Sequence, residues 1–260
     1  MKYENSEELY EEFNELCQDS LNDEFINACY DGDLNKIRYL LTSPDLKLHA
    51  DIDAQDGQGL IYACEKGLLN IVEYLLSSNE LEEHAYFFSE SSDLLSSACS
   101  GGNLDLVKLI LTSTDISQNP NIHADDDYAL YSACLCGHLE IVEYLLTSKD
   151  LEDHADINAN DDKAIEGAAG AGHLDIVKYL LTSPNLEYYG NIHEAFHSAY
   201  ESKHIDIVEY LILELNIEKT PMIEQSLKNH SDDIILKMFE VRDLNNHLPT
   251  KLEKSKKVKL

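Results

Sequence analysis

The sequence predicts an all-α solenoid, a stack of helix–turn–helix units joined by short projecting turns. The first observation behind this is an internal repeat, because one ten-residue pattern returns at a fixed spacing along most of the 260 residues. The second is that the apolar side chains of each copy fall on one face of a helix. The third is that apolar residues make up 43% of the chain, enough for a core in spite of a net charge of −31.

The repeat is most easily followed from its glycines. In the fourth copy Gly137 begins the run Gly-His-Leu-Glu-Ile-Val-Glu-Tyr-Leu-Leu, and every copy keeps an aliphatic residue at its third, sixth, ninth and tenth places. Five copies start 35 residues apart and a sixth starts 31 residues later. Such spacing is typical of stacked repeats. The copies begin at Gly32, Gly67, Gly102, Gly137, Gly172 and Lys203.

Each unit is predicted to hold a turn and two helices. The apolar face of the second helix follows the spacing i, i+3, i+6, i+7, given in the fourth copy by Leu139, Val142, Leu145 and Leu146. A shorter helix over 130–136 precedes it and ends at Gly137, since glycine suits a left-handed C-cap. The polar residues 154–162 predict a projecting turn before the next unit. Neither helix can bury its apolar face alone, so the units must stack.

The segments that flank the repeats are predicted to cap the stack. Residues 7–19 have the pattern of an acidic amphipathic helix, and residues 223–229 and 232–240 predict two further helices. Such caps cover the apolar face that a terminal unit would otherwise expose. The predicted organisation is an N-terminal acidic capping helix over 1–20, six repeats over 21–216, a C-terminal helical cap over 217–246 and a basic flexible tail over 247–260.

Three stretches of the sequence resemble ankyrin repeats: GHLEIVEYLL at 137–146, GHLDIVKYLL at 172–181 and ADINA at 155–159. The divergent copies are similar to the ankyrin arrays of giant viruses and intracellular microbes. Gly-Leu-Ile-Tyr at 59–62 replaces the family's TPLH, and the loop after the second helix is longer than usual, with 43–46 predicted as a capped extra helical turn. The resemblance implies a protein-binding module with a concave face of turn tips and first helices.

The charge excludes several classes of partner. Binding to DNA or RNA needs lysine and arginine to replace phosphate counterions, and this chain has 19 such residues against 50 acidic ones. An anionic membrane surface would repel it for the same reason, and the acidic start of the sequence has no apolar segment of a secretory signal. We therefore expect a soluble monomer that binds a cationic protein, with no direct nucleic acid and no membrane.

The cysteines and most histidines recur with the repeat, which predicts structural roles for them. Neighbouring helices lie about 8–10 Å apart, whereas a disulfide needs Cα atoms within about 7 Å. We therefore expect buried, unpaired thiols and a reducing compartment, the cytoplasm. The cysteines of the first helices are Cys29, Cys64, Cys99 and Cys134, the loop histidines are His49, His84 and His154, and His138 and His173 follow turn glycines.

One motif points to metal chemistry. His193, Glu194 and His197 match HExxH, in which two histidines on one helix face bind zinc and the glutamate polarises a water molecule. The longer form of that motif needs glycine and histidine where this chain has Tyr200 and Lys203, so a third ligand is missing. A zinc metalloprotease is kept as a remote alternative. No other catalytic or nucleotide-binding motif occurs, so we expect no enzyme, no bound metal and no cofactor.

The predicted partner surface combines aromatic and acidic residues at turn tips and first helices. Apolar side chains at otherwise polar tips indicate a contact, and carboxylates beside them fit a segment that carries lysine, arginine and an apolar side chain. The open alternative is that the aspartates cap helices and the tyrosines pack on neighbouring loops. The predicted contact residues are Tyr86, Phe88, Asp125, Asp126, Asp127, Tyr128, Tyr131, Asp161, Asp162 and Tyr188.

The predicted function is non-catalytic binding of another protein, as an adaptor or inhibitor that takes a basic or mixed surface. The alternative is an acidic nucleic-acid mimic whose carboxylates replace phosphates and block a DNA- or histone-binding protein. The last ten residues hold five lysines, and Lys256, Lys257, Val258 and Lys259 fit a minimal nuclear-import pattern. Nuclear entry is therefore a further expectation, and the alternative is a charged tail that lies on the acidic body.

Overall fold

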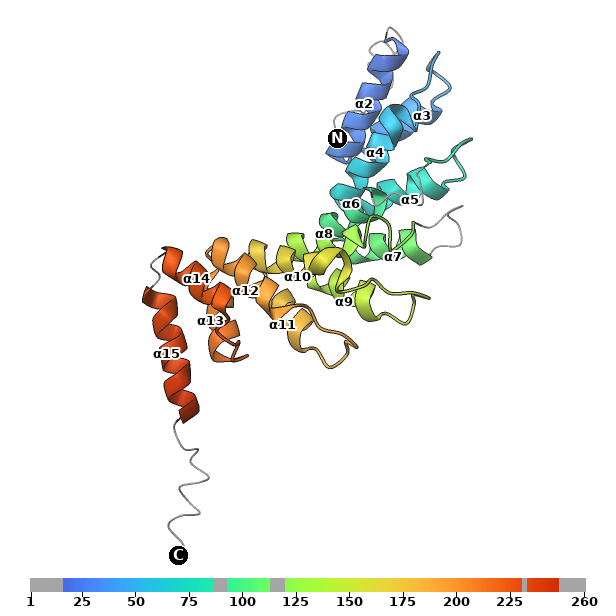
Figure 1. Cartoon of the computed structure of the whole chain (residues 1–260). Helices are drawn as coiled ribbons and strands as arrows, with labels where there is room; N and C mark the ends of the chain where they lie inside the picture. Colours follow the sequence, from blue (N-terminus) through green and yellow to red (C-terminus); the bar gives the residue numbers. More distant parts are fainter. Residues whose placement is uncertain (1–15, 87–92, 113–119, 231–232, 248–260) are drawn as a thin grey trace, which may run out of the picture. The chain divides into compact units, whose positions relative to one another are not determined.

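The computed structural model describes residues 16–86, 93–112, 120–230 and 233–247 (Figure 1). These residues form fourteen helices and no strand, so the predicted all-α fold is confirmed for them. The chain divides into two compact units, residues 1–164 and 165–260, and each is described by itself. None of the described helices is long and apolar enough to cross a membrane.

Six pairs of helices follow the repeat. The first helices of the pairs are α2 (Gln18–Asp31), α4 (Ala54–Glu65), α6 (Asp93–Gly101), α8 (Tyr128–Cys136), α10 (Ala159–Ala171) and α12 (Ile192–Glu201). The second helices are α3 (Leu34–Thr42), α5 (Leu69–Ser77), α7 (Leu104–Thr112), α9 (Leu139–Thr147), α11 (Leu174–Thr182) and α13 (Ile205–Leu213). All second helices have nine residues, as the constant ten-residue pattern predicts.

The boundary expected between residues 20 and 21 falls inside a helix. α2 begins at Gln18, and its first buried side chain is Leu21. Residues 18–20 therefore belong to the first helix of the first repeat and not to a separate capping helix. The rest of the expected N-terminal cap, residues 1–15, lies outside the described residues.

The first helices of the first unit pack in series, α2 on α4, α4 on α6 and α6 on α8, and the second helices α5, α7 and α9 do the same (Figure 1). Four equivalent thiols lie inside this stack, where a small side chain lets the helices approach. They are completely buried and unpaired, as predicted, and burial raises their pKa, that of Cys29 to about 12. The thiols are those of Cys29, Cys64, Cys99 and Cys134.

Thiol labelling tests the stack directly. Cys17 and Cys136 are exposed, and a hydrogen bond with Ser20 lowers the pKa of Cys17. Because the thiolate is the reactive form, we expect two of the six thiols to react with a disulfide reagent in the native protein, Cys17 faster than Cys136, and all six to react in denaturant. Rapid reaction of four or more native thiols would show that the stack is open.

Polar side chains at the second position of the repeat tie three of the units to the one before. The side-chain amide of Asn103 donates to the Gly67 carbonyl at 2.9 Å, and the His138 ring donates to the Ser100 carbonyl at 2.9 Å. In the second unit the His204 ring reaches the Gly170 carbonyl at the same distance. These bonds use carbonyls at the ends of first helices, which have no partner inside their own helix.

Substitutions at two turn glycines can distinguish the cost of backbone strain from the cost of disturbing this contact between repeats. Gly32 and Gly102 both have positive φ, 80° and 76°. A Cβ at Gly102 would lie 2.4 Å from the His138 ring, whereas a Cβ at Gly32 would have only ordinary contacts with Leu68 at 3.6 Å. We expect Gly102→Ala to lower the free energy of unfolding, measured in urea, by about 1 kcal/mol or more beyond Gly32→Ala. Equal losses would mean that the His138 ring moves aside freely.

The long loops after α3, α5, α9 and α11 are hydrogen-bonded turns and not the extra helical turn that we predicted. Ser43 is extended, with ψ at 125°, as expected for a residue before proline. Its carbonyl accepts from the Leu46 amide at 3.2 Å and from the His49 ring at 2.9 Å, which fixes the turn. The equivalent rings of His84 and His154 hold the equivalent loops in the same way.

Two helices follow the last repeat in the second unit. They are α14 (Pro221–His230) and α15 (Asp233–His247), so α15 continues beyond residue 240, where the sequence predicted its end. Phe239 of α15 is buried, with its ring 6.3 Å from that of Phe196, and Arg242 donates to the Ile217 carbonyl. These two contacts hold α15 against the sixth repeat. The basic tail from 248 onwards lies outside the described residues.

Candidate functional site

The turn tips, here called fingers, owe their shape to left-handed backbone. Each of three fingers has three consecutive residues with positive φ, and aspartate, asparagine and glycine tolerate that conformation better than other residues. In the fourth finger, residues 121–127, this turn leaves Asp125 and Asp126 exposed. The three triplets occupy residues 55–57, 125–127 and 160–162.

Asp127 differs from the two aspartates before it because it is buried, with 7% of its side chain exposed. Its carboxylate accepts the Asp156 amide at 3.1 Å and lies 2.9 Å from Nδ1 of His123. Burial raises the pKa of Asp127, although the Asp156 amide and the His123 ring act in the opposite direction. Asp127 therefore holds neighbouring fingers together and has little surface to offer a partner, unlike the role predicted for it.

Three side chains on α8 form the surface that we call the α8 patch: the exposed Tyr128 and Leu135 and the half-buried Tyr131. Their spacing, i, i+3 and i+7, places them on one helix face. Tyr128 is 44% exposed and Leu135 is 41% exposed, and the rings of Tyr128 and Tyr131 lie 5.3 Å apart between centroids. Asp125 and Asp126 directly precede the patch, so the structure brings together four of the predicted contact residues.

Other predicted contact residues come from neighbouring fingers. Tyr86 of the third finger is 52% exposed, and its amide donates to the Asp53 carboxylate at 2.7 Å. Asp161 is exposed, whereas Asp162 is half-buried and accepts from Asn158 at 2.6 Å. Phe88 lies outside the described residues, and Tyr188, 66% exposed, stands on a loop of the second unit.

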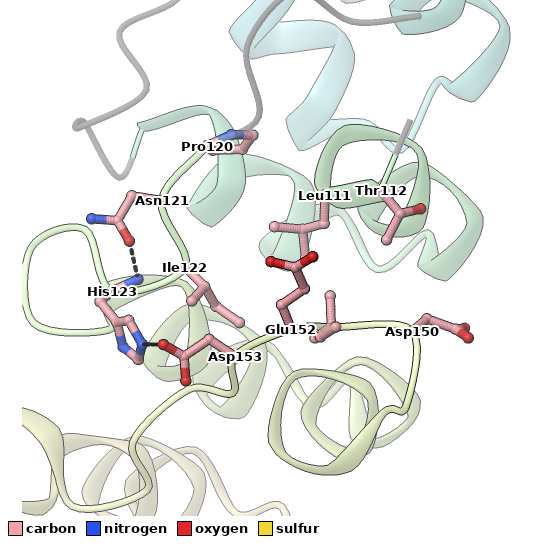
Figure 2. A pocket seen from close by; sticks show the side chains of 10 residues that line it. Leu111, Thr112, Pro120, Asn121, Ile122, His123, Asp150, Glu152 and Asp153 are labelled. Atoms are coloured by element: carbon pink, nitrogen blue, oxygen red, sulfur yellow. Dashed lines mark hydrogen bonds and ion pairs between the residues drawn. The ribbon is translucent and has the colours of Figure 1, made fainter. Parts of the chain in front are cut away.

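A groove lies between the fourth finger and the loop that follows α9 (Figure 2). Its volume is about 510 Å³, and three carboxylates, those of Asp150, Glu152 and Asp153, line one wall. An equivalent groove of about 440 Å³ recurs two repeats earlier, with Glu80 and Glu82 among its lining residues. Because the two grooves use equivalent positions, they are a property of the repeat.

His123 spans the first of these grooves between two carboxylates. Its Nδ1 lies 2.9 Å from the Asp127 carboxylate, and its Nε2 lies 3.2 Å from the Asp153 carboxylate on the facing loop (Figure 2). Burial acts to lower the pKa of His123, but Asp153 and Asp127 outweigh it, so the pKa is raised. The same contact lowers the pKa of Asp153. This bridge was not predicted, because it joins a finger to a loop about 30 residues further along.

The HExxH residues lie on α12 with the expected helical spacing. His193 is half-buried, with its Nδ1 buried and without a hydrogen-bond partner among the described residues, and His197 is exposed. In the described part of the chain no group of three or more His, Cys, Asp or Glu side chains is placed to hold a metal ion. The structure thus supplies no third ligand to the metalloprotease alternative.

A second aromatic pair was missed in the sequence. Tyr30 of α2 and Tyr62 of α4 meet edge to face at 5.4 Å, and the Lys66 ammonium lies 4.1 Å from the centroid of the Tyr30 ring. Tyr30 is 49% exposed. Comparison of equivalent positions would have found it, because Tyr30 occupies the same place in the repeat as Leu135.

The comparisons with known proteins agree with the helix pairs. The model for ankyrin repeats, in three copies, matches residues 79–161. Residues 79–161 are therefore ankyrin repeats. No curated protein matches it.

The matched ankyrin repeats include α6 to α9, the fourth finger and the α8 patch. Ankyrin repeats generally mediate protein–protein interactions. The exposed aromatic and acidic residues of this protein therefore lie within repeats of a type that binds other proteins.

Alanine substitutions distinguish the structural aspartate from its exposed neighbour. Asp126 and Asp127 both have positive φ, so alanine costs the backbone a similar amount at either position. Only Asp127→Ala removes the buried acceptor of the Asp156 amide. We expect Asp127→Ala to lower the free energy of unfolding by about 1–3 kcal/mol more than Asp126→Ala, measured by urea denaturation. A smaller loss in Asp127→Ala would contradict its structural role.

Proposed function

We propose that this ankyrin-repeat protein is a non-catalytic adaptor or inhibitor that binds a basic or mixed segment of another protein. The contact surface consists of the α8 patch together with the exposed tips Asp125 and Asp126, and Tyr86 and Asp161 extend it to the adjacent fingers. The observation that carries the proposal is an exposed tyrosine, a half-buried tyrosine and an exposed leucine on one helix face, beside two exposed carboxylates.

Physical chemistry favours this kind of partner. Tyrosine is enriched among residues that dominate binding energies, because a large ring buries much area with little loss of side-chain entropy. Exposed carboxylates attract lysine and arginine, speed association and disfavour acidic partners. The net charge of −31 acts in the same direction over the whole molecule.

The compartment belongs to the same proposal. Six free thiols, four of them buried, suit a reducing environment such as the cytoplasm. The lysine-rich tail would permit nuclear entry, and we propose a monomer as the binding form.

The second candidate is an acidic mimic of nucleic acid, supported by the same net charge. Binding of that kind depends on many spread carboxylates and on counterion release, so it weakens steeply as salt rises. It does not depend on apolar side chains. Salt and the α8 patch therefore separate the two candidates.

The test begins with capture of partners from cytosolic lysate at physiological salt. The affinity of a captured protein is then measured for the wild type and for a Tyr128→Ala/Tyr131→Ala variant. We expect the double substitution to weaken binding by about 2 kcal/mol, roughly 30-fold. Unchanged affinity would remove the α8 patch from the binding surface.

Tyr189→Ala is the matched control, since it removes an exposed ring that is not among the predicted contact residues from a loop of the second unit. We expect little change in affinity from it. Binding of basic proteins that is lost at physiological salt, and that is equal in all three proteins, would favour the mimic instead.

A further inference from the structure

The two hydrogen bonds of the His123 ring depend on how many protons the ring and its two carboxylate partners hold. Both ring nitrogens face carboxylate oxygens, at 2.9 Å from Asp127 and 3.2 Å from Asp153. An ionised carboxylate only accepts hydrogen bonds, and a neutral imidazole has a single N–H group. The two bonds can therefore exist together only when the bridge holds one extra proton.

That proton belongs on the ring. Asp153 and Asp127 together raise the pKa of His123, and the His123 ring lowers the pKa of Asp153. Both directions favour an imidazolium beside a carboxylate. Asp153 is 77% exposed, so it has no burial that would favour its neutral form.

We propose that His123 is a pH-sensitive latch, which ties the fourth finger to the loop after α9 when its ring is doubly protonated and frees that loop when it is singly protonated. The latch crosses the groove of Figure 2, with His123 on one wall and Asp153 on the other. It therefore sets how firmly the acidic wall of the groove is held against the finger. This role does not depend on the identity of any partner.

The order of bond loss follows from burial. Asp127 is 7% exposed and would lose a hydrogen-bond donor inside the protein, whereas Asp153 can exchange His123 for water. On deprotonation the remaining N–H stays on Nδ1 and faces Asp127. The bond to Asp153 is the one that breaks, so the loop after α9 is freed and the finger keeps its shape.

Acidic groups dominate the surroundings of the ring. Asp150 and Glu152 line the facing wall with Asp153, Asp125 and Asp126 share the finger of His123, and Asp156 donates its amide to Asp127. Among the described lining residues of the groove there is no lysine or arginine. The facing loop also carries the titratable ring of His154, which is bonded to the Ser148 carbonyl.

The equivalent loop two repeats earlier serves as an internal control for the latch. Two repeats earlier, Asp53 occupies the position of His123 and Glu83 that of Asp153. The Asp53 carboxylate accepts the Tyr86 amide at 2.7 Å, and with no imidazole at this position the same latch cannot form. That loop still carries His84, the equivalent of His154, bonded to the Ser78 carbonyl at 3.0 Å. Any effect of the loop histidine alone would therefore appear in both loops.

The experiment is an NMR titration of the full chain between about pH 5.5 and pH 9. We expect the His123 ring to titrate above the ordinary histidine value of about 6.5, and the amide signals of Asp150 to Asp153 to shift with the same midpoint. The amides of Glu80 to Glu83 should show no such transition. The stability that the latch adds is fully present below about pH 6.5 and is lost as pH rises through the raised pKa.

Two variants complete the test. His123→Gln should abolish the transition in the amides of 150–153, and Asp153→Asn, a change at an exposed site, should lower the His123 midpoint while the fold is kept. The latch is overturned if the 150–153 transition persists in His123→Gln. It is also overturned if His123 titrates at or below about 6.5, or if the ring titrates and the loop does not respond.

Discussion

The structure depends on one constraint, which is that no helix pair can bury its apolar face without the next pair. A unit of about 35 residues is too small to form a core, so each first helix must pack on its neighbours in register. Register places equivalent side chains at the same depth in every unit, and it explains why cysteine and alanine recur at the closest approach of α2, α4, α6 and α8. Hydrogen bonds between repeats, such as that from the His138 ring to the Ser100 carbonyl, then add a directional contact to the apolar burial that sets the register.

Register also explains a departure from the usual sequence of the family. Where the TPLH motif would stand, this chain begins with Gly59, and a Cβ there would lie 2.8 Å from the ring of Phe25. Phe25 is completely buried and belongs to the preceding repeat. The large ring fills the volume that a side chain at position 59 would take, so the two changes compensate each other across the interface.

The helices could be predicted from sequence because apolar periodicity is local and six copies report on the same pattern. The burial or exposure of individual polar residues could not be predicted in this way. Asp125, Asp126 and Asp127 look alike in sequence, yet three left-handed residues in a row turn the third carboxylate inward and leave the first two in solvent. The His123 bridge needs the distance between a finger and a loop, which no local pattern contains. The tyrosines of the α8 patch were found because they break the pattern of the repeat, and residues of that kind are the ones that stacking does not explain.

Three basic residues of the second helices are used in contacts between repeats. The residue before the conserved tyrosine position alternates along the array as Arg38, Glu73, Lys108, Glu143, Lys178 and Glu209. Each cation lies over the tyrosine ring of the next repeat, with 5.1 Å from Arg38 to Tyr74, 5.7 Å from Lys108 to Tyr144 and 4.8 Å from Lys178 to Tyr210.

These cations thus serve the contact between neighbouring repeats, where a charge over a ring contributes about 0.5–1 kcal/mol. They lie on the second helices, and Arg38 also reaches a loop carboxylate, that of Glu80, at 3.4 Å. With 19 cations against 50 acidic residues in the chain, few remain to neutralise the loops. Among the described residues that line the groove of the fourth finger there is no lysine or arginine, and the ring of His123 contacts the carboxylates of Asp127 and Asp153. Three carboxylates on one wall of this groove make it attractive to a cation from outside the chain, which supports the proposal of a basic partner.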